Sequence, residues 1–109
     1  MIRPGLARVV GASMEPTLRE GDLLLVLWGA RPKIGGLAIV ELPRDEDGAP
    51  RPISVKRVTG TDPDDPTRWW VERDNPRAGV DSWLVGSLPD EAILARTLLR
   101  IPCRRATFT

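Results

Sequence analysis

Prolines and glycines are the feature of this sequence that most restricts its fold. The 109-residue chain contains 11 prolines and 10 glycines, distributed from end to end. Proline interrupts the hydrogen bonding of a helix interior, and glycine destabilises a helix. Because these residues leave few long uninterrupted stretches, the sequence excludes a fold built of long helices. A chain of this length is expected to form one domain, spanning residues 1–109.

The short apolar runs between these breaks are typical of β-strands. Their predicted bounds are residues 6–10, 22–28, 37–42, 53–58, 68–73 and 94–101. Within the run at residues 37–42, the first four residues are apolar without a break, which favours burial on both faces. Residues 43–52 and 61–67, rich in acidic side chains and proline, are predicted to be exposed turns, and residues 89–93 a single helical turn. The predicted fold is mainly β: a small, coiled antiparallel β-barrel or sandwich with little helix.

Charge, hydropathy and cysteine content argue against several classes of partner. The chain has 16 basic and 15 acidic residues, so its net charge of +1 gives no electrostatic footprint for nucleic acid. The longest apolar run, residues 23–28, is far shorter than the about 20 residues of a membrane-spanning helix. We therefore expect no nucleic-acid partner and no membrane insertion by this chain. The single cysteine, Cys103, fits a reducing, cytoplasmic setting, and no metal or other cofactor is expected.

The absence of histidine restricts the catalytic chemistry further. A nucleophilic serine in this chain cannot be served by imidazole, which excludes a Ser-His-Asp triad. A lysine can take the place of histidine when burial lowers its pKa, because the neutral amine then accepts the proton of the serine. Ser13 follows a turn after an apolar run, and Lys56 lies inside a second apolar run. These residues predict a Ser-Lys dyad, provided that the lysine has no carboxylate partner.

The segments around these two residues resemble the signal peptidase I family of serine proteases. The run Ser13-Met14-Glu15-Pro16-Thr17 matches the family's Ser-Met-x-Pro-Thr motif, and Lys56-Arg57-Val58 matches its Lys-Arg-Val motif. The resemblance implies that Ser13 is the nucleophile and Lys56 the general base. Backbone N–H groups around Ser13 would bind the oxyanion, since a glycine stands where many family members carry a hydroxyl donor. The implied supporting residues from these two motifs are Gly11, Met14, Pro16 and Arg57.

A third motif, residues 73–83 with Gly86 beyond it, resembles the family's Gly-Asp-Asn…Ser-x-Asp-Ser-Arg…Gly block. The matching residues, which the resemblance makes supporting residues of the site, are Asp74, Asn75, Asp81 and Ser82. Three positions differ: Arg73 replaces a glycine, Gly79 replaces the serine that hydrogen-bonds the catalytic lysine, and Trp83 replaces the closing arginine. The resemblance therefore implies that the lysine lacks one orienting contact and that Asp81 lacks its family partner.

Within that family, residues 74–82 and 88–91 look like the nickel-type superoxide dismutase maturation proteases. Those enzymes trim a leader so that the mature N-terminus can bind nickel. The implied partner is a precursor protein, and the candidate substrate is a nickel superoxide dismutase precursor. The sequence starts with methionine shortly before Ser13 and shows no apolar helix ahead of it, so a naturally soluble protease without a membrane anchor is expected.

Two alternatives stay open. One is a non-catalytic peptide-binding module descended from such proteases, which the changes at Gly79 and Trp83 would permit. The other is the catalytic domain of a general signal peptidase. A self-cleaving LexA-like domain would need a cleavage site ahead of Ser13, and the few preceding residues leave no room for one. The tryptophans are expected to pack in the core and at its rim rather than to stack on bases; they are Trp28, Trp69, Trp70 and Trp83.

Overall fold

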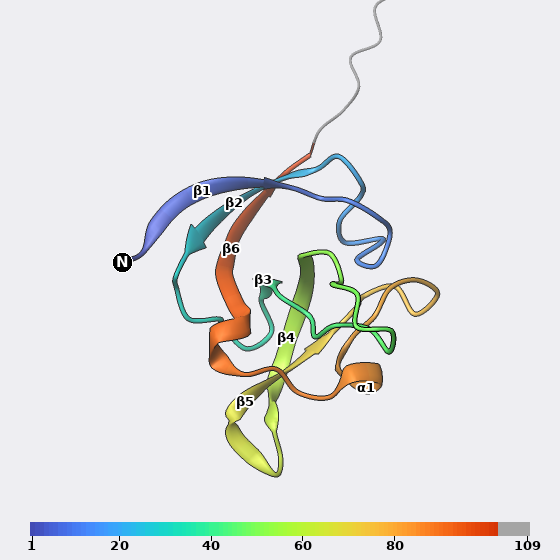
Figure 1. Cartoon of the computed structure of the whole chain (residues 1–109). Coiled ribbons are helices and arrows are strands. Elements are labelled where there is room, and N and C mark those ends of the chain that lie inside the picture. The colour runs from blue at the N-terminus through green and yellow to red at the C-terminus, as the bar shows by residue number, and fades with distance from the viewer. Residues whose placement is uncertain (103–109) are drawn as a thin grey trace, which may run out of the picture.

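A computed structural model describes residues 1–102 of the chain, so Cys103 lies outside the described residues. The strands are β1 (Arg3–Arg8), β2 (Leu23–Trp28), β3 (Leu37–Val40), β4 (Ser54–Asp62), β5 (Asp65–Glu72) and β6 (Ile93–Ile101), with a short helix α1 (Ser82–Val85) and a 3₁₀ turn η1 (Asp90–Ala92) before β6. The six strands form one antiparallel sheet in the order β1-β2-β6-β3-β4-β5 (Figure 1). The mainly β, antiparallel prediction is confirmed. Within residues 1–102 the edge strands β1 and β5 do not pair, so the sheet is open.

The predicted bounds of the first, fourth and fifth strands are wrong. The first strand covers Arg3–Arg8 instead of residues 6–10, because residues 3–8 are the ones in register with β2. Most of the predicted turn at residues 61–67 belongs to strands, since β4 runs to Asp62 and β5 begins at Asp65. The proline at position 66 is tolerated because β5 is an edge strand, where a missing N–H need not break a ladder. Helix α1 is not among the elements predicted from the sequence.

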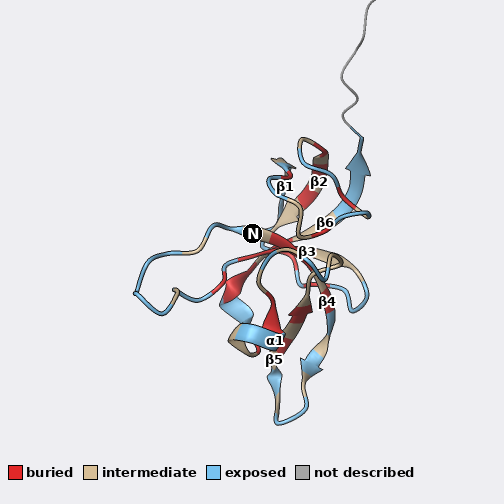
Figure 2. Ribbon diagram, turned by 90° about the vertical axis from the view of Figure 1, so that its right-hand side faces the viewer, coloured by how far each residue is buried: buried red, intermediate tan, exposed pale blue. Residues whose placement is uncertain are grey.

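The apolar core has two parts, one on each face of the central strands. Figure 2 shows in red where buried residues lie along these strands. Strand β3 contributes to both: Ala38 and Val40 pack in one part, and Ile39 in the other. This confirms the two-sided burial expected from its unbroken apolar run. Strand β4 divides in the same way, with Val55 in the part next to β2 and Val58 in the part next to β5.

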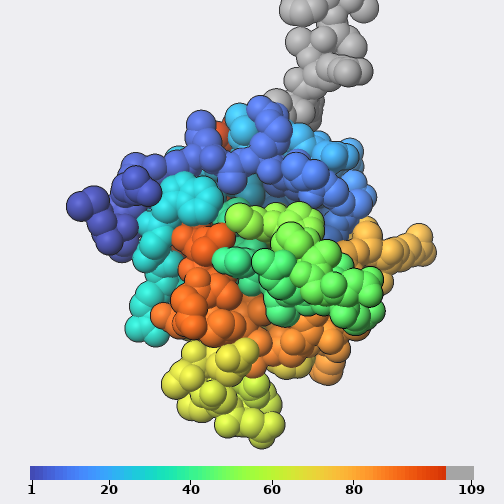
Figure 3. Space-filling view, viewed as in Figure 1, coloured from blue at the N-terminus to red at the C-terminus, as the bar shows by residue number. Residues whose placement is uncertain are grey.

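Two long connections meet beside the middle of the sheet. Residues 9–22 link β1 to β2, and residues 73–81 link β5 to α1; both lie on the right-hand side of Figure 1, and they are neighbours on the molecular surface in Figure 3. Their contact is direct, since the backbone N–H of Asn75 donates to the carbonyl of Ser13 at 2.9 Å. No helix in residues 1–102 is both long and apolar enough to cross a membrane.

Candidate active site

Ser13 lies in the connection between β1 and β2, which is held in place by buried apolar side chains. Met14 and Leu18 are each only 1% exposed and pack in the same part of the core as Val9. A hydrogen bond of 2.9 Å from the N–H of Leu18 to the carbonyl of Met14 closes one tight turn between them. Burial of two large side chains so close to Ser13 fixes its backbone while its side chain stays half-buried.

Lys56 reaches Ser13 from β4. Its Nζ donates to Ser13 Oγ at 2.8 Å, so the structure brings together the two residues that the sequence singled out. Lys56 is 2% exposed, and burial lowers the pKa of its amine, an effect that the positive charge of Arg73 reinforces. The negative charge of Asp81 opposes this pKa shift. None of the ion pairs in residues 1–102 includes Lys56, as the dyad hypothesis requires.

Gly79 packs directly against this pair. It has a φ of 91°, and a Cβ atom built on it would stand 2.4 Å from Ser13 Cβ and 3.3 Å from Lys56 Nζ. Position 79 is thus as close to the amine as the motif resemblance suggested. Glycine is nevertheless required here, because the left-handed backbone and the contact with Ser13 both exclude a side chain.

Arg57 and Asp74 tie three elements together behind the dyad. The guanidinium of Arg57 donates from Nε and Nη2 to the two oxygens of Asp74 at 2.9 and 2.7 Å, and Thr17 Oγ1 donates to Asp74 Oδ2 at 2.6 Å. The hydrogen bond from Arg57 holds the pKa of Asp74 below its usual range, and Asp74 raises the pKa of Arg57. This ion pair joins β4, the Ser13 connection and residues 73–81.

Asn75 fastens the Ser13 connection from the other side. Besides its backbone contact with Ser13, its side-chain amide donates to the carbonyl of Ala12 at 2.8 Å. Gly11 precedes this contact with a φ of 83°, which accounts for glycine at that position. Pro16, two residues after Met14, is exposed and follows a cis peptide bond with Glu15.

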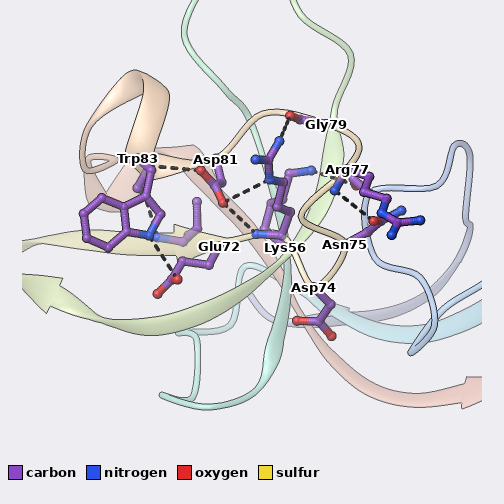
Figure 4. A network of polar contacts seen from close by, with 12 residues as sticks. Lys56, Glu72, Asp74, Asn75, Arg77, Gly79, Asp81 and Trp83 are labelled. Atoms are coloured by element: carbon purple, nitrogen blue, oxygen red, sulfur yellow. Dashed lines mark hydrogen bonds and ion pairs between the residues drawn. The ribbon is translucent and has the colours of Figure 1, made fainter.

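Asp81 has a partner, contrary to the expectation from the missing arginine at position 83. Its Oδ2 accepts the backbone N–H of Arg73 at 3.1 Å and forms an ion pair with Arg73 Nε at 3.8 Å. Arg73 also donates from Nη1 to the carbonyl of Gly79 at 2.6 Å. Asp81 Oδ1 caps α1 by accepting the N–H of Trp83 at 3.1 Å (Figure 4). Arg73 therefore joins the two ends of the connection formed by residues 73–81, which lies against Ser13 and Lys56.

Ser82, the last of the expected supporting residues, acts on the sheet. It is buried, and its Oγ accepts the backbone N–H of Val71 at 2.9 Å, which anchors α1 to β5. A cavity of about 350 Å³ opens beside the dyad, with Val10, Leu42 and Val80 among its apolar walls and Ser13 and Lys56 in its lining. In residues 1–102 no group of three or more His, Cys, Asp or Glu side chains could hold a metal ion.

Comparisons of the chain with family models, with curated proteins and with solved structures find no match. The site is thus described by its own geometry. Two of its residues were missed by the sequence analysis: Thr17, which bonds Asp74, and Arg73, which bonds Asp81 and Gly79. Thr17 belongs to the serine motif itself, and that position was the signal for it. For Arg73 the only signal was an arginine beside Asp74 in a motif that lacks its usual arginine.

Proposed function

We propose that this chain is a serine endopeptidase that uses Ser13 as nucleophile and Lys56 as general base. The observation that carries the proposal is the 2.8 Å hydrogen bond between a 2% exposed lysine amine and the serine hydroxyl. A lysine in water has a pKa near 10.4, so only about one amine in 2,500 is neutral at pH 7. Burial that lowers the pKa of Lys56 increases this neutral fraction. A buried lysine turned toward a serine has little structural benefit, whereas a general base needs this setting.

The proposed reaction begins when Ser13 Oγ attacks a peptide carbonyl and transfers its proton to Lys56 Nζ. The carbonyl oxygen then becomes an oxyanion next to the backbone N–H of Ser13, which has no acceptor among residues 1–102 and is oriented by the buried Met14 that follows it. Collapse of this intermediate breaks the peptide bond, and the Lys56 ammonium gives its proton to the departing amine. Water, deprotonated by Lys56, then releases the acyl group from Ser13.

The strand geometry supports an extended peptide as substrate. Residues 54–56 of β4 pair with β3 on one side, whereas β5 pairs with β4 only from Arg57 onward. The backbone of β4 next to the dyad is therefore open to an added strand, a common mode of peptide binding. The cavity beside the dyad is walled by small and medium apolar side chains such as Val10 and Ala78, which favours small residues next to the cleaved bond.

The finer proposals concern the family and the substrate. The bent antiparallel sheet with this dyad supports a barrel-like fold of the signal peptidase and LexA type. We propose that the substrate is a precursor with a short leader, processed in the cytoplasm, with the nickel superoxide dismutase precursor as first candidate. The specific alternative is a general signal peptidase domain, which would prefer secretory signal peptides. A non-catalytic peptide-binding role is disfavoured by the contact between Ser13 and Lys56.

The test is to incubate the purified protein with a nickel superoxide dismutase precursor and, separately, with a secretory precursor, and to read new N-termini by mass spectrometry. We expect the dismutase leader to be removed without lipid or detergent. The Ser13→Ala variant should leave it intact while keeping the circular dichroism spectrum of the parent. Cleavage that persists in Ser13→Ala would refute the mechanism. Efficient cleavage of the secretory precursor alone would assign the chain to general signal peptidases.

A further inference from the structure

A second hollow lies on the outer face of the β4–β5 hairpin, which projects from the body of the molecule in Figure 3. Its volume is about 570 Å³, and its walls come from residues 59–64 around the hairpin turn, from Trp70 and Glu72 on β5, and from Trp83 on α1. It shares no lining residue with the cavity beside the dyad. The proposed peptidase mechanism makes no use of this hollow.

Two tryptophans form a corner of this hollow. The rings of Trp70 and Trp83 meet edge to face, with centroids 5.2 Å apart and planes at 83°. Trp83 is 75% exposed, and its position is fixed by a hydrogen bond of 3.1 Å from Nε1 to Glu72 Oε1 (Figure 4). Trp83 thus packs against Trp70 at the rim, as expected, but most of its surface stays exposed. The exposed ring of Trp83, perpendicular to the partly exposed ring of Trp70, offers a face that attracts a cation.

The charged side chains that line this hollow are all acidic. Asp62, Asp64 and Glu72 line the hollow, and no basic side chain does. Of the basic groups on these strands, Arg57, opposite Glu72, is bonded to Asp74. Arg68 is bonded to Ser87, and its positive charge also acts on Asp62, so Asp64 and Glu72 are the carboxylates on which the attraction of a cation depends. The chain as a whole carries a net charge of +1, so attraction of a cation to this face must be local.

We propose that this hollow binds an arginine or lysine side chain of an extended peptide segment. The guanidinium or ammonium group of that side chain would contact the faces of the indole rings of Trp70 and Trp83. At the edge of the hollow, the carboxylates of Asp64 and Glu72 would form ion pairs with it. This proposal does not depend on peptidase activity. Because Trp83 follows closely on Asp81, a peptide bound here would lie next to the connection that covers the dyad.

The experiment measures binding to the Ser13→Ala variant, so that cleavage plays no part. The probe is the peptide acetyl-Gly-Arg-Gly-Lys-Gly-Arg-Gly-amide, titrated by calorimetry and by NMR of the indole N–H signals, with an otherwise identical peptide in which glutamine replaces every basic residue. We expect the basic peptide to bind and to shift the Trp70 and Trp83 signals, leaving Trp28 unshifted. The glutamine peptide should not bind.

Variants in the same background locate the site. Trp83→Ala should weaken binding about tenfold or more, and Glu72→Gln by a smaller factor. Leu84→Ala is the matched control, since Leu84 is a 64% exposed neighbour on α1 that does not line the hollow; it should bind like the parent. Equal binding by Trp83→Ala and the parent, equal binding of both peptides, or no binding of the basic peptide at millimolar concentration would each overturn the proposal.

Discussion

Two neighbouring basic residues on opposite faces of β4 differ in burial, in ion pairing and in the direction of their pKa shift. Lys56 is 2% exposed, has no ion-pair partner in the described part of the chain, and has a pKa that burial lowers. Arg57, the next residue, points to the other face, pairs with Asp74 through two hydrogen bonds, and has a raised pKa. Strand alternation thus separates a buried amine from a structural ion pair by one residue. The same strand supplies the proposed base and holds the connection that covers it.

The largest expected effect comes from removing the amine. Lys56→Met keeps most of the side-chain volume, so we expect peptide cleavage to fall by about 10²- to 10⁴-fold, the usual contribution of a general base. The melting temperature should stay the same or rise, because a buried charge has been removed. Lys56→Arg should also be inactive, since a guanidinium keeps its proton. Measurement of kcat/KM together with thermal melts checks both points; a Lys56→Met enzyme with near-parental kcat/KM would show that the amine is not the base.

The sequence was sufficient to predict a mainly β, antiparallel fold and to single out Ser13 and Lys56, which the structure brings into contact. Apolar runs between prolines and glycines predicted an antiparallel β fold, and the absence of histidine made lysine the expected base for Ser13. The contact at 2.8 Å between residues 43 positions apart is consistent with that prediction. The order of the strands in the sheet could not be read, because it depends on which long-range pairs bury most surface.

Side-chain partners were harder to predict than positions. The motif indicated that Asp81 had lost its arginine, and the structure shows that Arg73 reaches it across the connection. This pairing depends on the loop bringing positions 73 and 81 side by side, which spacing alone does not reveal. The tight contact of Gly79 with Ser13 was equally hidden, because a glycine in a sequence does not show what it faces.

The next largest effect is expected from a side chain at position 79, where the backbone packs against Ser13 and Lys56. In Gly79→Ala the new methyl would overlap Ser13 Cβ and force a residue with a side chain into a left-handed conformation, so we expect a loss of roughly 2–4 kcal/mol in unfolding free energy. Gly48→Ala is the matched control: Gly48 has a similar φ of 79° but nothing within 4 Å of its added Cβ. It should lose only about 1–2 kcal/mol.

Urea unfolding of the two variants measures this difference in unfolding free energy. An assay of peptide cleavage is a second, independent test. Gly79→Ala should also lose cleavage activity, because relief of the overlap must displace Ser13 from Lys56 or move the connection away. Gly79→Ser, which would restore the hydroxyl of the related motif, should behave like Gly79→Ala for the same steric reason. Equal stability of the Gly79→Ala and Gly48→Ala variants would mean that residues 73–81 do not pack on the dyad.

The smallest effect is expected in the pH dependence of the unfolding free energy. This measurement compares Lys56 on one face of β4 with Asp74, the partner of Arg57 on the other face. The pKa of Asp74 is lowered in the folded chain, so its stabilising contribution is complete above the unfolded value near 3.9 and is lost as the pH falls through the folded value. The pKa of Lys56 is also lowered. Between that folded pKa and about 10.4 the unfolded chain binds more protons at this site, and stability rises with pH.

The two contributions therefore occupy separate pH windows, and each changes the unfolding free energy by at most about 1.4 kcal/mol per pH unit. Urea titrations from pH 3 to pH 10 should show that Asp74→Asn makes only the acid limb shallower, since Asp62 and Asp65 also have lowered pKa values and contribute to it. Lys56→Met should flatten only the rise above neutral pH. Few other groups titrate in the upper window, because the chain has no histidine or tyrosine and only one other lysine, Lys33, which is exposed. Lys33→Met should keep the rise, which makes it the matched control. If Lys56→Met kept the rise as well, the amine at position 56 would have an ordinary pKa, and the contrast between the two faces of β4 would be lost.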